Sequence, residues 1–440
     1  MKKRLLAVIL AAAMTVGVLT GCGDKGNNGG ASEGASSAVP KTEEGNSGAE
    51  GSSAAAASGE AITFWYMGDS STGIQPLIDE FTQETGIAVN VQSIPWQSLS
   101  EKLLTAISSQ SGPDVMQTAV SRTAELVAAN AIIDMSEYVD SIEVFGKDKF
   151  FDASYESLEM DGKYYGVPWI VDVFLPFYRT DIFADAGYQE FPKTQEEFLE
   201  ACKAITEKTG KYSWEINCAN DYNSLFCYPY QSGSEIITKD RKPVFNGKEF
   251  VDAMNYLNSF FEAGLSSRIV DGVASDVKLT NGDVASCVGS AYLAQQLSAN
   301  PDMDGKWAPA VWPKGAATNY SVYAGSNLVI ASWNKNEEAC VKLVEFLARP
   351  ENQLKYREQT NALPAGKDAW ADESLKNDPV MSVFYEQMQN AKPFPKVPEI
   401  EEIAIDCTKY FERISLGEED VQTVMDEMNQ QAEKILSNNN

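Results

Sequence analysis

Two hydrophobic periods alternate along the chain after residue 60. Short runs that are apolar, or that alternate between apolar and polar residues as β-strands do, occupy residues 61–67, 87–92 and 113–119. Between them, residues 74–86 and 99–112 have apolar side chains three and four positions apart, which predicts amphipathic helices. Strands that alternate with helices in this way indicate an α/β fold with largely parallel sheets.

Three later helices are predicted from the spacing of a capping box, in which the first residue and a Glu three positions later satisfy each other's backbone N–H groups. The predicted pairs are Thr194 with Glu197, Asn246 with Glu249, and Asn334 with Glu337. The last two helices should end near Gly264 and Pro350, because these residues terminate helices.

The segment 166–183, GVPWIVDVFLPFYRTDIF, is apolar and aromatic enough for a buried strand but carries Asp172 near its middle. A buried carboxylate without a partner is energetically costly, so chains avoid this arrangement unless something pairs with the acid. We therefore expect Asp172 to have a polar partner.

Polar and aromatic residues also follow several predicted strands. They form WYMGDSS at 65–71, TAVSR at 118–122 and WIVD at 169–172. In open α/β sheets, ligands bind beyond the carboxyl ends of the strands. Aromatic residues in strands belong to the core more often than to a site. Trp and Tyr beside Asp, Asn and Arg nevertheless suit a sugar, whose ring faces stack on aromatic rings while its hydroxyls bond to polar groups.

The first residues of the chain have the pattern of a secretory signal. Lys2, Lys3 and Arg4 precede an apolar run over residues 5–18, which ends in small residues before a polar segment. A transmembrane anchor is the alternative, but a spanning helix needs about 20 apolar residues. Residues 23–60 are mostly Gly, Ser and Ala, and this composition predicts a flexible tether.

Composition excludes several functions for the rest of the chain. The net charge of −28, from 35 basic and 63 acidic residues, makes nucleic acid and anionic lipid poor partners. The absence of His removes Ser-His-Asp and Cys-His nucleophile systems and His-ligated zinc. We expect no metal and no cofactor. Among the scattered cysteines, Cys218 and Cys227 form the most plausible disulfide by proximity, although a body of this size does not need one.

Taken in order, these segments resemble the extracellular solute-binding proteins of family 1, the carbohydrate-importing ABC type that includes maltodextrin-binding proteins. The resemblance runs from about residue 61 to the C-terminus through segments such as ITFWYMGDSSTGIQPLIDEFTQETG, SGPDVMQTA, DGKYYGVPWIVDVFLPFYRTDIFADAG and AGSNLVIASWNKNEEACVKLVEFLARPENQ. LTGC at 19–22 resembles the lipobox of bacterial lipoproteins, in which the cysteine becomes the lipidated first residue.

The resemblance implies two α/β lobes, the periplasmic-binding-protein-like fold, with a hinge and a ligand cleft between the lobes. It also implies an order along the chain: signal peptide 1–21, lipidated Cys22 and tether 22–60, and a tail 436–440. The first lobe would take 61–170 with 314–360, and the second 171–313 with 361–435.

The same resemblance implies a set of ligand-binding residues. Asp172 falls at a ligand-contacting carboxylate of the maltodextrin-binding members, where it accepts sugar hydroxyls or, alternatively, pairs with an Arg or Lys that braces the hinge. Ser121 and Asn220 replace acidic residues of those members, which puts maltodextrin itself in doubt. Tyr66 and Trp169 are included because they flank matched positions. The full set is Tyr66, Asp69, Ser121, Arg122, Trp169, Asp172, Asn220, Tyr222 and Tyr292.

The function that the resemblance implies is the binding and delivery of a sugar, without any reaction of the sugar. A monomeric lipoprotein, outside the cytoplasm and anchored in the cell membrane, would bind a mono- or oligosaccharide and deliver it to the transmembrane subunits of an ABC permease. Two alternatives stay open: a lipoprotein that presents sugar to a sensor kinase, and a tethered glycoside hydrolase. The hydrolase would need two carboxylates roughly 5–10 Å apart, which sequence spacing cannot test.

Overall fold

The computed structural model describes residues 61–217, 221–269, 271–417 and 419–438. The signal peptide, the tether and two predicted site residues, Cys22 and Asn220, lie outside these ranges. None of the described helices is long and apolar enough to cross a membrane.

The strands are β1 (Ile62–Met67), β2 (Val89–Ile94), β3 (Val115–Ala119), β4 (Glu159–Met160), β5 (Lys163–Tyr164), β6 (Val167–Val173), β7 (Leu175–Arg179), β8 (Ser286–Gly289), β9 (Trp307–Pro309), β10 (Ser321–Ile330), β11 (Leu363–Pro364) and β12 (Ala391–Lys392). The α-helices are α1 (Gln75–Thr85), α2 (Leu99–Ser109), α3 (Thr123–Ala128), α4 (Ser136–Ser141), α5 (Asp152–Glu156), α6 (Thr180–Asp185), α7 (Gln195–Thr209), α8 (Tyr222–Ser232), α9 (Lys248–Glu262), α10 (Ser275–Asn281), α11 (Ala291–Ser298), α12 (Glu337–Ala348), α13 (Pro350–Thr360), α14 (Glu373–Lys376), α15 (Pro379–Met388), α16 (Ile400–Leu416) and α17 (Val421–Asn438). A 3₁₀ turn, η3 (Val120–Arg122), joins β3 to α3.

The larger sheet has the strand order β11-β6-β10-β3-β1-β2, with β12 paired to the start of β10; we call it the large sheet. Its strands β1, β2 and β3 are parallel, as predicted. Strand β10 runs antiparallel to β3 and β6, and β11 runs antiparallel to β6, whereas β12 pairs with β10 in parallel, so the prediction of largely parallel sheets is only partly right. The antiparallel part arises because β10 enters this sheet from the other sheet, without the helical crossover that parallel neighbours need.

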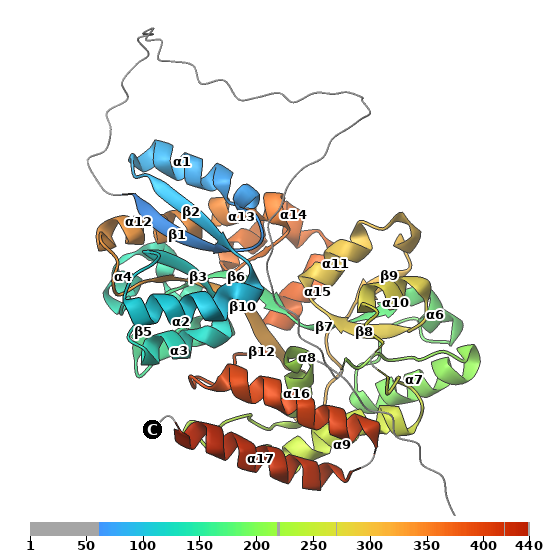
Figure 1. Cartoon of the computed structure of the whole chain (residues 1–440). Helices are drawn as coiled ribbons and strands as arrows, with labels where there is room; N and C mark the ends of the chain where they lie inside the picture. Colours follow the sequence, from blue (N-terminus) through green and yellow to red (C-terminus); the bar gives the residue numbers. More distant parts are fainter. Residues whose placement is uncertain (1–60, 218–220, 270, 418, 439–440) are drawn as a thin grey trace, which may run out of the picture. The chain divides into compact units, whose positions relative to one another are not determined.

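Strand β1 is buried on both faces, which explains its almost continuous apolar sequence. Phe64 and Tyr66 belong to the same core cluster as the apolar face of α1. Trp65 and Met67, which point the opposite way, belong to a second cluster with Leu99 of α2. Helix α1 therefore covers one face of the large sheet, and α2 and α3 cover the other (Figure 1).

The second sheet has the order β8-β7-β9, and all of its pairs are antiparallel; we call it the small sheet. Helices α6, α10 and α11 lie beside it (Figure 1). Its middle strand contributes Phe177, which is fully buried and stacks on Trp307 with ring centroids 5.8 Å apart.

The chain passes from the large sheet to the small sheet with a single residue, Phe174, between β6 and β7. It returns at Ser321, the first residue of β10. The hydroxyl of Ser321 accepts a hydrogen bond from the N–H of Phe174 at 3.1 Å and donates one to its C=O at 2.8 Å. Trp312 Nε1–H donates to the same carbonyl at 2.6 Å. The two crossings are therefore tied side by side.

Gly325 is required where β10 lies against β6. Its φ is +121°, and a Cβ at this position would lie 2.1 Å from the carbonyl oxygen of Ile170. The close approach puts Ala324 opposite Asp172 in the register, so it helps to set where the carboxylate lies.

Of the three predicted capping boxes, the one at Thr194 and Glu197 is confirmed in both directions. The other two are wrong. Asn246 instead donates from Nδ2 to Asp426, so α9 begins after Gly247 without a side-chain cap. Helix α12 is capped by Asn336, whose Oδ1 accepts from the N–H of Ala339.

Cys227 is a free, buried thiol whose Sγ lies 3.4 Å from the carbonyl oxygen of Asn223, so the candidate disulfide with Cys218, which a body of this size does not need, is not present at Cys227. Cys218 itself lies outside the described residues. Burial raises the pKa of Cys227 to about 12, which keeps the thiol protonated and unreactive at neutral pH.

Candidate functional site

Asp172 lies near the end of β6, where the chain is about to leave the large sheet. Trp169, Val171 and Val173 are buried on one face of this strand, and Asp172 projects to the other face. Its Oδ1 accepts hydrogen bonds from the N–H of Val173 at 2.9 Å and from the N–H of Ala291 at 3.2 Å. Ala291 is the first residue of α11, which follows a strand of the small sheet. The carboxylate therefore links the two sheets through the start of a helix.

Ser290, the N-cap residue of α11, also hydrogen-bonds to this carboxylate. Burial nevertheless raises the pKa of Asp172 to about 6, because the three hydrogen bonds only partly compensate for lost hydration. Among the described residues, no Arg or Lys forms an ion pair with Asp172, so its observed partners are backbone and hydroxyl donors.

Arg122 lies at the end of η3, just beyond the carboxyl end of β3 in the large sheet. Its guanidinium donates to Glu125 at 2.9 Å and to the hydroxyl of Ser100 at 2.7 Å. Its Nη2 also lies 3.9 Å from Oε2 of Glu401, in the first turn of α16. Glu401 accepts a second contact, a hydrogen bond of 3.0 Å from the hydroxyl of Tyr222. Arg122 and Tyr222, both predicted site residues, are thus joined through Glu401.

Tyr222 begins α8 and is held by aromatic packing. Its ring contacts Phe394 edge-on, with centroids 5.8 Å apart, and Phe226 at 6.2 Å. Burial and the negative charge of Glu401 raise the pKa of Tyr222, so the phenol stays protonated and available as a donor.

Tyr66 and Trp169 belong to the core. Trp169 is 1% exposed and Tyr66 is 6% exposed, and both contact the ring of Tyr356. The hydroxyl of Tyr66 hydrogen-bonds to that of Tyr356 at 2.9 Å. A wall residue of a ligand site would present an accessible ring face, which neither residue does here.

The remaining predicted residues are dispersed. Ser121 is buried in η3, Asp69 is exposed after β1, and Tyr292 is 68% exposed on α11. Tyr292 follows Ala291, so its backbone lies close to Asp172. The structure thus joins Arg122 to Tyr222 through Glu401, and Asp172 to the start of α11, but it does not gather the described members of the predicted set into one enclosed pocket.

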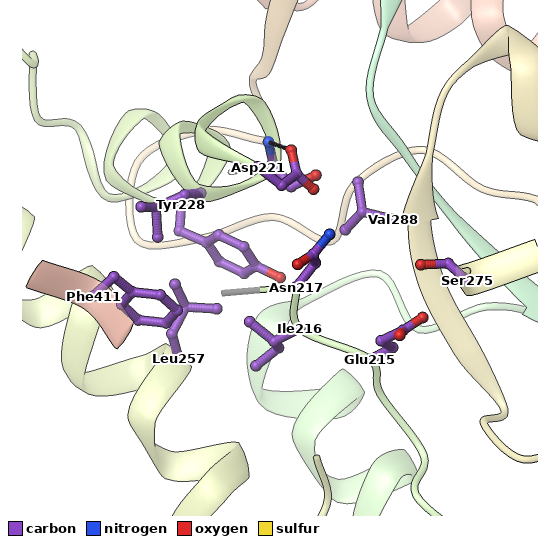
Figure 2. Close-up of a pocket in the computed structure, with 11 residues that line it drawn as sticks. Glu215, Ile216, Asn217, Asp221, Tyr228, Leu257, Ser275, Val288 and Phe411 are labelled. Carbon is purple, nitrogen blue, oxygen red and sulfur yellow. Dashed lines mark hydrogen bonds between the residues drawn. The ribbon is translucent and has the colours of Figure 1, made fainter. Parts of the chain in front are cut away.

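Figure 2 shows a cavity of about 30 Å³ beneath the first turn of α8. Asp221 and Asn217 lie on one side of it, and Leu257 and Phe411 on the other. The dashed line marks the bond by which Oδ1 of Asp221 caps α8 at the N–H of Ser224. A volume of this size holds about two waters but no sugar ring. The cavity is therefore not itself a sugar site.

A larger hollow of about 630 Å³ lies next to Phe394, which contacts the ring of Tyr222. It is lined by Ala124 and Val127 of α3 and by the segment 392–398, but by none of the predicted site residues that the structure describes. No group of three or more His, Cys, Asp or Glu that could hold a metal occurs among the described residues.

Sequence reasoning missed Glu401, Ser100 and Ser290. Glu401 stands in an acidic stretch, EIEE, that reads as the solvated start of a helix, and nothing in its spacing separates it from the other acids. Ser290 precedes Tyr292 in GSAY, and its capping role follows only once the helix start is known.

Comparison with known proteins places this geometry in a family. The model for bacterial extracellular solute-binding proteins matches residues 76–383. The sugar-binding protein MalE of Xanthomonas citri has a similar structure, with a TM-score of 0.82 and 28% identity over 86% of this chain and 98% of that one. The galactooligosaccharide-binding protein of Bacillus subtilis is 23% identical over 86% of this chain and 90% of its own length. The diacetylchitobiose-binding protein DasA of Streptomyces coelicolor is 29% identical over 54% of this chain and 51% of its own length. These likenesses confirm the predicted two-lobed fold.

The raised pKa of Asp172 predicts a pH-dependent stability. Its folded pKa of about 6 lies above the ordinary value of 3.8, so this group favours the folded state most at low pH, and that contribution is lost as the pH rises toward 6. Asp172→Asn keeps an acceptor oxygen for Ala291 but cannot ionise. We expect its free energy of unfolding, relative to the wild type, to increase by roughly 1–3 kcal/mol between pH 4 and pH 7. Urea unfolding followed by circular dichroism at several pH values measures this.

Asp69→Asn is the matched control, because Asp69 is exposed. Its difference from the wild type should stay constant with pH. A difference for Asp172→Asn that stays constant, or that falls as the pH rises, would contradict the burial of an ionisable carboxylate at this position.

Proposed function

Because the chain belongs to the bacterial extracellular solute-binding protein family, we propose that it captures a mono- or oligosaccharide between its two lobes and delivers it to the permease of an ABC importer. The likeness to a sugar-binding protein over 86% of the chain is the observation that carries the proposal. Relatives whose names specify galactooligosaccharide, arabinooligosaccharide and maltodextrin support a carbohydrate as the ligand class.

The contacts around Arg122 and Asp172 suit this role. Arg122, just beyond β3 of the large sheet, lies 3.9 Å from Glu401 of α16, which also accepts the hydroxyl of Tyr222, and Asp172 at the end of β6 meets the start of α11 beside the small sheet. Carboxylates and a phenol held in this way are acceptors and donors for sugar hydroxyls, and charge-assisted bonds of this kind are stronger than neutral ones. A sugar that contacts both lobes favours the closed form, since only that form offers both sets of groups.

The bound sugar undergoes no covalent reaction in this proposed function. The relatives are binding proteins, and the sequence contains no His to activate a nucleophile. Release would follow when the permease opens the lobes, and the sugar would leave unchanged.

Attachment through Cys22 completes the proposal. The lipobox-like LTGC and the Gly- and Ser-rich segment that follows support a lipid anchor outside the cytoplasm, joined to the folded body by a tether. The tether would keep the body near its permease and raise the effective concentration.

Saccharide binding predicts a rise in melting temperature, because a ligand that binds only the folded state stabilises it. At 1,000 times its dissociation constant, the ligand adds about 4 kcal/mol. We expect at least one galacto-, arabino- or malto-oligosaccharide, or diacetylchitobiose, to produce this rise in a thermal-shift panel, and chromatography to recover the sugar intact. A panel without any shift would contradict sugar capture. Product that accumulates in proportion to the protein would instead indicate a hydrolase.

The anchor is tested in cells that express the full chain. Cys22→Ser should abolish incorporation of labelled palmitate and release the protein from the membrane or leave its signal uncleaved, since the lipid is attached to that sulfur. Cys202→Ser, which alters a buried thiol of the folded body, is the control and should retain the label. Labelling that persists in Cys22→Ser would rule out the lipoprotein assignment.

A further inference from the structure

Glu401 meets predicted site residues of both lobes, and this inference about it rests on the proposed function. It stands in the first turn of α16, and its side chain is 17% exposed. Its Oε2 accepts the hydroxyl of Tyr222 at 3.0 Å and faces the guanidinium of Arg122 at 3.9 Å. A sugar held between Arg122 and Tyr222 would therefore lie against Glu401.

Arg122 is fixed mainly by its own lobe. Its contacts with Ser100 and Glu125, at 2.7 and 2.9 Å, are much shorter than the 3.9 Å that separates it from Glu401. At 3.9 Å the guanidinium lowers the electrostatic cost of a partly buried carboxylate without forming a close bidentate pair. Glu401 is thus compensated in charge but not saturated in hydrogen bonds.

The two carboxylate oxygens of Glu401 have different partners. Oε2 accepts a hydrogen bond from the hydroxyl of Tyr222 and faces the guanidinium of Arg122, whereas Oε1 has no hydrogen-bond partner in the described part of the chain. A carboxylate oxygen accepts about two hydrogen bonds. Oε1 is therefore an acceptor left for water or for a ligand hydroxyl, while Tyr222, packed between Phe226 and Phe394, keeps the carboxylate oriented.

We propose that Glu401 is a specificity-determining contact of the saccharide site, whose Oε1 accepts a hydroxyl of the bound sugar. Because this oxygen only accepts, it selects a ligand that presents a hydroxyl donor there. Arg122 faces Oε2, so the negative charge at Oε1 also selects against a sugar carboxylate at this position, since like charges repel strongly where water is partly excluded. The ligand class is thus a neutral saccharide, and uronate-containing ones are rejected.

A purely structural role is the alternative for Glu401. In that case it would only brace Tyr222 and Arg122, and its loss would weaken all saccharides equally, together with the stability of the unliganded protein. The ratio of affinities for a neutral and an anionic sugar separates the roles, because bracing does not change which charge the site accepts.

The test uses the whole folded body and isothermal titration with two probes, galactotriose and trigalacturonate; where another neutral trisaccharide binds best in the panel, it replaces galactotriose. Glu401→Gln keeps the shape of the side chain and removes its charge. We expect the affinity for the neutral probe to fall about 5- to 50-fold, as for loss of a charged hydrogen-bond partner, while the preference over trigalacturonate shrinks at least 10-fold. Glu402→Gln is the matched control, because Glu402 is the next residue and is exposed; its affinities should stay within about 2-fold of the wild type.

The possible results either support or overturn the role of Glu401 as a sugar contact. Wild-type affinity in Glu401→Gln, or equal losses for both probes together with a lower melting temperature, would overturn the contact while leaving sugar capture intact. A wild-type protein that binds no neutral saccharide would overturn both this inference and the proposed function. A smaller preference for the neutral probe, at an unchanged melting temperature without ligand, is the result that the inference requires.

Discussion

The hydrogen bonds between Ser321 and Phe174 hold together the two places where the chain crosses between its sheets. Only one residue separates β6 in the large sheet from β7 in the small sheet, so any rotation of one sheet against the other must be absorbed there. The close approach of Gly325 to Ile170 sets the neighbouring register. The residues that follow β3 and β12 meet where Arg122 faces Glu401, and those that follow β8 meet Asp172 at the start of α11.

The polar groups of that region are only partly satisfied by the protein. Oδ1 of Asp172 accepts from the backbone N–H groups of Val173 in β6 and of Ala291 at the start of α11, and Oε1 of Glu401 has no hydrogen-bond partner among the described residues. Keeping such groups half-buried costs stability, which the core elsewhere must offset. The unsatisfied acceptors also favour binding of a hydroxyl-rich ligand, because its hydroxyls replace water at acceptors that are already oriented.

The periodic parts of the chain were predictable, because a strand such as β1 and a helix such as α1 show their buried faces as sequence periods. The position of Asp172 in a buried strand was predictable for the same reason. Its partner was not, since Ala291 is distant in sequence and reaches it only through the crossing at Phe174. Glu401 was missed because local sequence does not distinguish a carboxylate that meets Arg122 from one in solvent. Tyr66 and Trp169 were predicted as site residues only because they flank matched positions. The alternation of side chains along β1 and β6 directs both rings into the core.

A saccharide captured between the two lobes should touch both of them. Hydrogen exchange followed by mass spectrometry, with and without the oligosaccharide that binds best, shows which segments the ligand protects. We expect slower exchange in the segments around Arg122 and Asp172 and also around Tyr222, Ala291 and the first turn of α16, with little change in α1 or α17. Protection confined to one lobe, or located away from these segments, would contradict capture between the lobes.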